Sequence, residues 1–294
     1  MNHIDYGFQN CPVLGLGLGF RHKYFEELLG SSFIDWLEYT PENYMGYGGH
    51  SKNYLKRLQK LYPLVPHGVS LSIGSIDEFN EDYLAKLEEL FEEFNPPWFS
   101  DHLCFSSVLG NYSNDLIPLP RTQETIEHIV KRIKFLQDRF QKPILIENIS
   151  FYMDYPESHL DDSEFISVIL EKADCGFLLD VNNVYVNSQN HKFNPYEYLD
   201  NLPLNRVVQV HIAGHTEYPD GIIDTHGNTI KNEVWDLLDY LLRQSNPCGV
   251  MIERDLNLPS WSELAEEVIK LKGIWDKHYK KRFIQRTLTE KISS

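Results

Sequence analysis

Eight short apolar segments alternate with longer amphipathic segments from one end of this chain to the other. Each apolar segment is rich in branched or aromatic residues, as is typical of a strand that is buried on both faces. Buried strands separated by helices form parallel sheets, because the crossover helix returns the chain to the starting edge of the sheet. The strand segments are VLGLGLGF, DWLEYTPENY, LVPHGVSLSI, WFSDHLCF, PILIENIS, GFLLDVNN, VVQVHIAGH and GVMIERD.

The intervening segments have the period of α-helices. Apolar residues recur every three or four positions in 122–140 and 232–242, and Asn194 and Ser260 are placed to cap further helices. No linker rich in Gly, Ser or Pro divides residues 1–294, so we expect one α/β domain, a (β/α)8 TIM barrel. A doubly wound open sheet is the alternative, but its usual GxGxxG phosphate loop is absent.

Charge and composition exclude several classes of function. The formal net charge is −16, which disfavours nucleic acid as a partner, and we interpret the basic stretch 277–294 as a solvated tail. No apolar run is long enough for a membrane span, and the first ten residues lack the pattern of a signal peptide. The four cysteines are far apart and form no CxxC pair, so we expect a cytoplasmic protein with reduced thiols.

Histidines and acids stand at the carboxyl ends of six successive predicted strands. In a barrel these ends meet at one mouth, so the side chains would share one bowl. The loop after the seventh strand adds two more in DTHG. The candidates are His67, His102, Glu147, Asn148, Asp180, Asn183, His211, His215, Asp224, His226 and Glu253.

Taken singly, each of these residues has a structural explanation, such as a helix cap or a hydrogen-bonded histidine. Together they place several carboxylates in one bowl with almost no lysine or arginine, which is costly unless cations neutralise them. Nitrogen and oxygen donors without thiolates suit iron, manganese or zinc. The number of donors exceeds the needs of one ion, so the sequence predicts two or three ions with a bridging carboxylate such as Glu147.

Further residues lie close to the predicted bowl. Glu42 and Asn43 lie at the end of the predicted second strand and face the same bowl, where they either contact substrate or order a metal-bound water, or else cap the next turn. Arg21 and Arg254 are the nearest cations, and for each a structural ion pair is weighed against binding of a peptide carboxylate. The segment 106–123 is expected to be a long irregular loop that forms part of the substrate cleft.

These motifs resemble the multinuclear non-heme iron-dependent oxidative enzymes, a family that includes the methanobactin biosynthesis oxidase. The similarity covers nearly the whole chain, and PHGVSLSIGS, DVNNVYVN and HIAGH occur together and in order. Other matching segments are GLGLGFR, EYTPENYMGYGG, SDHLCFS, ILIENIS, DTHG and ERD. The resemblance implies a xylose-isomerase-like barrel that carries two or three iron ions.

The resemblance also implies a ligand set. One iron would take His67, His102 and Glu147; a second would share Glu147 and take Asp180, His211 and Glu253; a third would use Asn183, Asp224 and His226. Glu147, Asp180 and His211 are the residues expected to act in catalysis, and His215 is expected behind the ligands.

The implied reaction is the O2-dependent oxidation of cysteine residues in a ribosomally made precursor peptide at a mixed-valence iron pair. A small partner protein would capture the leader of the peptide. The resemblance leaves the product, the number of irons and the oligomeric state open. Alternatives are a metal-dependent phosphodiesterase of the endonuclease IV type, a sugar isomerase and a metal-dependent binding module.

Overall fold

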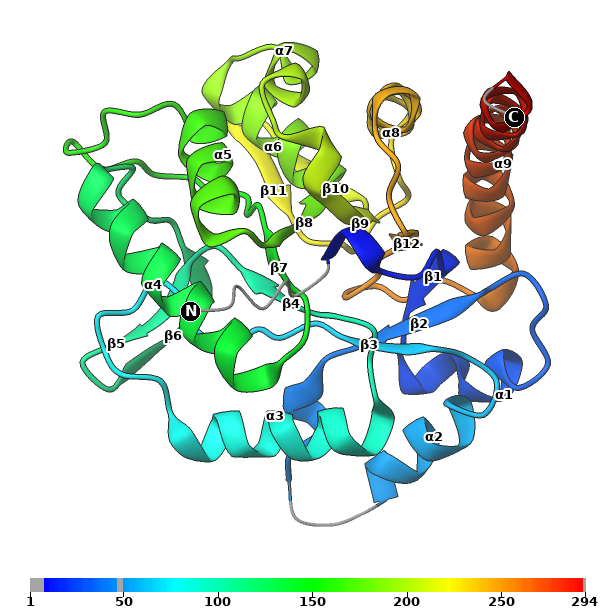
Figure 1. The fold of residues 1–294 in the computed structure, drawn as a ribbon, viewed down its shortest axis with the longest axis horizontal. Helices are drawn as coiled ribbons and strands as arrows, with labels where there is room; N and C mark the ends of the chain where they lie inside the picture. The colour runs from blue at the N-terminus through cyan, green and yellow to red at the C-terminus, as the bar shows by residue number, and fades with distance from the viewer. Residues whose placement is uncertain (1–7, 47–49, 293–294) are drawn as a thin grey trace.

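The computed structural model describes residues 8–46 and 50–292, and the eight predicted strands form one sheet in it (Figure 1). Every neighbouring pair is parallel, in the order β3-β2-β1-β12-β9-β8-β7-β4. A parallel bridge between His67 and Ser100 joins the two ends of the sheet, so the predicted barrel is confirmed. The strands are β1 Gly15–Gly19, β2 Trp36–Tyr39, β3 Leu64–Pro66, β4 Phe99–His102, β7 Ile144–Glu147, β8 Gly176–Asp180, β9 Val207–Ile212 and β12 Gly249–Ile252.

Helices surround the barrel on the outside (Figure 1). The apolar stripes of the two helices predicted at 122–140 and 232–242 are buried against it, as their period requires. The predicted caps also form, since the Asn194 side chain accepts a hydrogen bond from the Tyr196 amide and Ser260 exchanges hydrogen bonds with Glu263. The α-helices are α1 Phe25–Leu28, α2 His50–Leu58, α3 Glu81–Phe94, α4 Gln123–Phe140, α5 Asp162–Ala173, α6 Val181–His191, α7 Pro195–Asp200, α8 Asn232–Gln244 and α9 Trp261–Ile292, and 3-10 turns occupy Phe8–Asn10, His22–Tyr24, Pro41–Tyr44 and Leu204–Arg206.

The lower half of the barrel interior is an apolar plug. Trp36 and Trp98 are fully buried there and meet edge to face with their ring centroids 6.3 Å apart. Glycines of β1 and β12 make this packing possible, because a Cβ at Gly17 would lie 2.3 Å from the Trp36 ring and one at Gly249 would lie 2.9 Å from it. The plug leaves only the upper half of the interior, at the carboxyl ends of the strands, for polar side chains.

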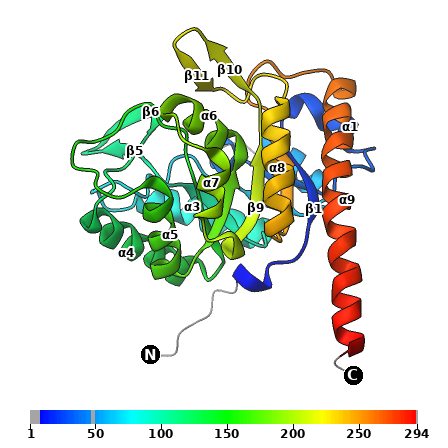
Figure 2. The same cartoon turned by 90° about the horizontal axis from the view of Figure 1, so that it is seen from above.

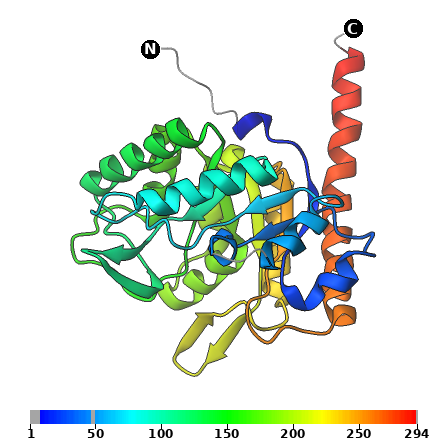
Figure 3. The same ribbon diagram turned by 90° about the horizontal axis from the view of Figure 1, so that it is seen from below.

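Two β-hairpins flank the mouth of the barrel. The first, β5 Phe105–Val108 with β6 Asn111–Ile117, replaces the irregular loop that the sequence predicts at 106–123. Its turn residues Leu109 and Gly110 both have positive φ, 50° and 72°, which matches the right-handed twist of the strands. The second hairpin pairs β10 His215–Tyr218 with β11 Gly221–Asp224, and Figures 2 and 3 show it projecting from the mouth.

Residues 277–292 of the basic stretch belong to helix α9. His278 is buried, and its Nε2 lies 2.8 Å from Asp239 Oδ1 on α8, which attaches this part of the helix to the barrel. Beyond it, α9 extends past the end of the barrel opposite to the β10–β11 hairpin (Figure 2). Within the described residues, no helix combines the length and the apolar character that a membrane crossing requires.

Candidate metal centre

The predicted histidines and acids converge at the mouth of the barrel. His67 directly follows β3, and Glu253 follows β12, while the other four of these strand-end residues lie within or at the end of their strands. All six side chains are nearly or fully buried. Strand register therefore brings together the predicted set of His67, His102, Glu147, Asp180, His211 and Glu253.

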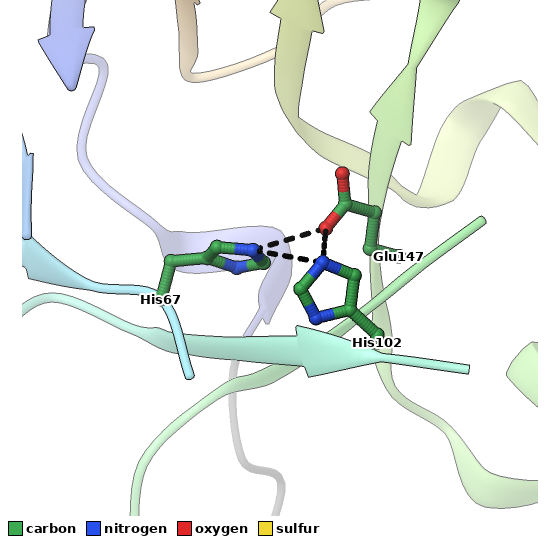
Figure 4. A group of neighbouring side chains, drawn as sticks. All are labelled: His67, His102 and Glu147. Carbon is green, nitrogen blue, oxygen red and sulfur yellow. Dashed lines mark hydrogen bonds and ion pairs between the residues drawn. The ribbon is translucent and has the colours of Figure 1, made fainter. Parts of the chain in front are cut away.

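The first cluster consists of two histidines and one glutamate (Figure 4). Glu147 Oε2 lies 3.1 Å from Nε2 of His67 and 3.1 Å from Nε2 of His102, and the two nitrogens are 3.3 Å apart. Each ring is held through its other nitrogen, since His67 Nδ1 contacts Ser100 Oγ at 2.9 Å and His102 Nδ1 contacts the Gly68 carbonyl at 3.2 Å. Rings that are oriented in this way direct both Nε2 lone pairs to one point, as in metal sites.

The second cluster shares Glu147 with the first. His211 Nδ1 lies 3.3 Å from Glu147 Oε1 and 3.0 Å from Glu253 Oε2. Asp180 joins them, with one oxygen close to both His211 and Glu147. Its Oδ1 accepts the Asn183 amide as the N-cap of α6, whereas its buried Oδ2 has no hydrogen-bond partner. The aspartate therefore caps a helix and still presents a free oxygen to the bowl.

The third cluster forms around the DTHG loop. His226 Nε2 lies 2.8 Å from Asp224 Oδ1 and 3.8 Å from Asp180 Oδ2, and its Nδ1 lies 3.2 Å from Glu253 Oε2. Asn183 Nδ2 donates to the Asn148 carbonyl at 3.0 Å, so the amide oxygen of Asn183 points the other way, and this buried oxygen has no partner. Eight of the nine predicted ligands thus lie in three adjacent clusters, and Asn183 lines the same cavity as Asp224 and His226.

The electrostatics of these buried side chains favour a cation. Burial alone would lower the pKa of His67, but the charges of Glu147 and Glu38 outweigh it and raise that pKa to about 9. Burial is likewise outweighed at His211, where neighbouring carboxylates hold the pKa well above its usual range. At Asp180, burial raises the pKa well above that of an ordinary carboxyl. These shifts arise from carboxylates that are buried and crowded together, whose charge divalent ions bound here would neutralise.

Several residues stand behind the ligands. The Asn148 side chain exchanges two hydrogen bonds with the backbone of Asp180, at 2.9 and 3.0 Å, and so ties β7 to β8. His215 Nδ1 lies 2.8 Å from Asn182 Oδ1, and Asn182 Nδ2 donates to Asp224 Oδ1 at 2.8 Å. The side chain of Asn182 thus links His215 to Asp224.

Glu42 and Asn43 are placed differently from the sequence expectation. The second strand ends at Tyr39 and a 3-10 turn follows, so neither residue continues it. Glu42 Oε1 accepts hydrogen bonds from the Val69 and Ser70 amides and from the Tyr83 hydroxyl, and Asn43 is exposed. The carboxylate of Glu42 therefore braces the loop after β3 instead of reaching into the bowl.

Sequence reasoning missed three residues at the site. Glu38 Oε2 lies 3.0 Å from His211 Nε2, Asn182 orients Asp224, and Asp255 Oδ2 lies 3.2 Å from His226 Nδ1. Glu38 could have been found as a carboxylate within an apolar strand. It was not selected because the second strand was expected to extend to Tyr44, which placed Glu38 far from the predicted strand end.

A cavity of about 590 Å³ opens from these clusters to solvent. Side chains of β6 form part of its wall, including Tyr112 and Leu116. Arg21 is its one lysine or arginine among the described residues, and it forms an ion pair with Asp255. The other nearby cation, Arg254, pairs with Glu267. Both arginines are thus in structural ion pairs, as weighed from the sequence.

Comparison with known proteins defines the class of protein. The family model described as "RiPP precursor modification enzyme MbnB/TglH/ChrH" matches residues 15–276. A UPF0276 protein of Anaeromyxobacter sp. (strain Fw109-5) is 42% identical over 87% of this chain and 90% of its own length. A UPF0276 protein of Acaryochloris marina is 40% identical over 87% of this chain and 92% of its own. The chain therefore belongs to the MbnB/TglH/ChrH family of RiPP precursor modification enzymes, as its motifs predict.

Solved structures share the fold. Endonuclease IV from Thermus thermophilus aligns with a TM-score of 0.57 and 16% identity over 90% of this chain and 99% of its own. The 3-keto-D-glucoside 4-epimerase of E. coli aligns with a TM-score of 0.54 and 13% identity over 89% of this chain and 98% of its own. At these identities the likeness concerns the xylose-isomerase-like barrel alone.

Proposed function

We propose that this protein is an iron-dependent oxidase that uses O2 to modify cysteine residues of a ribosomally synthesised precursor peptide. The observation that carries the proposal is the set of three adjacent clusters that share Glu147, Asp180 and Glu253. Among the described residues, the donors that face the bowl are nitrogen and oxygen atoms, which suits iron. Membership of the family of RiPP precursor modification enzymes supports a peptide as the substrate.

The donors fit two or three ions. His67, His102 and Glu147 would hold one ion, and Glu147, Asp180, His211 and Glu253 would hold a second. Asn183, Asp224 and His226 would hold a third, for which the unpartnered amide oxygen of Asn183 is available. Iron bound here in mixed-valence form would supply O2 activation and a site for the substrate thiolate.

The chain's own residues would prepare the reaction. The apolar plug beneath the bowl closes it from below, so a substrate can enter only through the mouth. Glu147, Asp180 and His211 act at the centre, where their buried carboxylates and imidazole experience a low dielectric and strong fields. Asp255 is exposed, pairs with Arg21 and lies 3.2 Å from His226 Nδ1, so it would orient the His226 ring at the rim of the bowl.

The cysteine that reacts would come from the substrate. Cys104, which follows β4, is buried, and burial raises the pKa of its thiol well above the ordinary value. A cavity of about 590 Å³ leaves room above the clusters for a peptide segment, with Tyr112 and Leu116 of β6 along its wall. We also propose a cytoplasmic location and a small partner protein that holds the leader of the peptide.

The test is reconstitution without oxygen. Metal-free protein loaded with Fe2+ is mixed with a short cysteine-containing peptide encoded beside its gene, together with any small protein encoded there, and O2 is then admitted. We expect O2 consumption and a mass change in the peptide. Neither should occur with Zn2+-loaded protein, nor with a peptide in which the cysteine is replaced by serine. A mass change that is independent of O2, or of the cysteine, would contradict the proposal.

The same preparation tests the alternative functions of this barrel. A phosphodiesterase needs a surface that accepts phosphate, but the chain carries a net charge of −16, and the one arginine among the described cavity residues is already paired. A sugar isomerase would want a lysine near the ions, and none lines the described cavity. Hydrolysis of a model phosphodiester, or epimerisation of a ketose, by the Zn2+- or Mn2+-loaded protein would favour these alternatives.

A further inference from the structure

Both ring nitrogens of His211 face carboxylates, as both nitrogens of His226 do. His211 is fully buried, and its Nδ1 faces Glu147 and Glu253 in the second cluster. On the opposite edge of the ring, Nε2 lies 3.0 Å from Glu38 Oε2. Gln209 Nε2 lies 2.8 Å from the same nitrogen, so one possible donor and one acceptor, Glu38, stand beside His211 Nε2. With Nδ1 directed to the ions, the ring hydrogen belongs on Nε2, where Glu38 accepts it.

Glu38 is itself fixed by a buried row of hydrogen bonds. Gln209 Nε2 donates to Glu38 Oε2, and Gln209 Oε1 accepts the indole hydrogen of Trp98 at 2.6 Å. Trp98 is an indole donor only, so it dictates which end of the Gln209 amide faces Glu38. Trp98, Gln209 and His211 are each fully buried, and Glu38 is 4% exposed. The row crosses the barrel interior between the apolar plug and the bowl.

We propose that Glu38, held by Gln209 and Trp98, is a positioning residue that locks His211 in the tautomer and orientation needed to bind metal through Nδ1. A carboxylate that accepts the distal hydrogen of a ligating imidazole also makes that imidazole a stronger donor. The proposal concerns how the metal centre is held, whichever substrate it acts on. A failure to oxidise the peptide would therefore leave it standing.

Direct ligation by Glu38 is the competing role, because one of its oxygens also lies within reach of His211 and Glu253 as a possible ligand group. The hydrogen bonds argue against it, since Oε2 accepts from both Gln209 Nε2 and His211 Nε2. A carboxylate oxygen that accepts two hydrogen bonds has little capacity left for an ion. The two roles differ in what is expected when the charge of Glu38 is removed: a positioning residue lowers the affinity for one ion, whereas a ligand loses that ion.

The experiment compares Glu38→Gln with the parent protein by anaerobic titration of metal-free chain with Co2+, using absorption and metal analysis. We expect the same number of ions, with the affinity for one ion lowered roughly 10- to 100-fold and the others unchanged. In ¹⁵N-histidine-labelled, Zn2+-loaded protein, the Nε2–H signal of His211 should shift and exchange faster with solvent. Trp98→Phe should cause a smaller change in the same direction, and the double variant should match Glu38→Gln alone.

Asp162→Asn is the matched control, because Asp162 accepts a hydrogen bond from Tyr198 at 2.5 Å and lines a different cavity. It should leave both the titration and the His211 signal unchanged. Unaltered affinity and signal in Glu38→Gln would overturn the proposal, and loss of a whole ion would assign Glu38 as a ligand instead. If Glu38→Gln does not fold, Trp98→Phe decides alone: the shifted His211 signal supports positioning, and the parent signal overturns it.

Discussion

Replacing Glu147 with glutamine tests whether one carboxylate serves two ions. Glu147 Oε2 is 3.1 Å from the Nε2 atoms of His67 and His102, and Oε1 is 3.3 Å from Nδ1 of His211, so the two oxygens face different clusters. Glutamine has nearly the same shape, but it replaces one oxygen with an NH2 group and removes the charge. Both clusters therefore lose a charged donor in a single substitution.

The magnitude follows from the number of clusters affected. Changes behind metal ligands cost roughly 10- to 100-fold in affinity, so loss of a ligand charge should cost at least about that much at each of two sites. This is about 1.4–2.8 kcal/mol for each ion. We expect the Glu147→Gln protein, loaded with iron and gel-filtered without oxygen, to retain at least one ion fewer than a variant that affects a single cluster.

Asp224→Asn is that single-cluster variant, because Asp224 lies 2.8 Å from His226 Nε2 and belongs to the third cluster only. It should lose at most one ion. Equal ion counts in the two variants, with melting temperatures that show both are folded, would refute the bridging role of Glu147.

Three further outcomes are expected. Asp180→Asn should keep the cap on the Asn183 amide and remove a buried carboxyl whose pKa is raised by burial. The metal-free variant should therefore melt no lower than the metal-free parent, while the number of ions that it binds falls. A much lower melting temperature would contradict this. Because the pKa of His67 is raised to about 9, metal uptake at pH 7 should release protons and the apparent affinity should rise with pH toward 9, as calorimetry in buffers of different ionisation heat would show; a pH-independent affinity would count against it. Leu238→Ala, at a fully buried position of α8, should cost roughly 2–5 kcal/mol in urea unfolding, whereas Ile269→Ala, 65% exposed, should cost less than about 0.5 kcal/mol.

The barrel was predictable because each buried parallel strand corresponds to a short apolar segment in the sequence. The hairpins were not, because β5–β6 turns at Leu109 and Gly110, and leucine does not indicate a positive φ. The end of the second strand was also misjudged. Pro41 begins a 3-10 turn, although DWLEYTPENY has the composition of a longer strand.

The convergence of histidines and acids at one mouth was predictable from one rule, that carboxyl ends of barrel strands meet there. This rule does not identify residues whose role depends on partners that are distant in the sequence. Glu42 turns away from the bowl because its three hydrogen-bond donors come from Val69, Ser70 and Tyr83, which no local pattern connects to it. Glu38 lies among strand residues, and only the register of β2 against β1 and the barrel closure bring it to His211.

Two buried aspartates show why these side chains need more than a structural explanation. Asp101 is 1% exposed, and both of its oxygens accept backbone hydrogen bonds, from the His102 amide at 2.7 Å and the Leu71 amide at 3.3 Å. Asp180 is fully buried as well, but only Oδ1 accepts a hydrogen bond and Oδ2 has none. An unpartnered buried oxygen costs about 1–3 kcal/mol, so Asp180 Oδ2 is available to a cation in a way that the oxygens of Asp101 are not. The unpartnered oxygens of Asp180 and Asn183 lie in the same bowl, and a cation shared between side chains accounts for both at once.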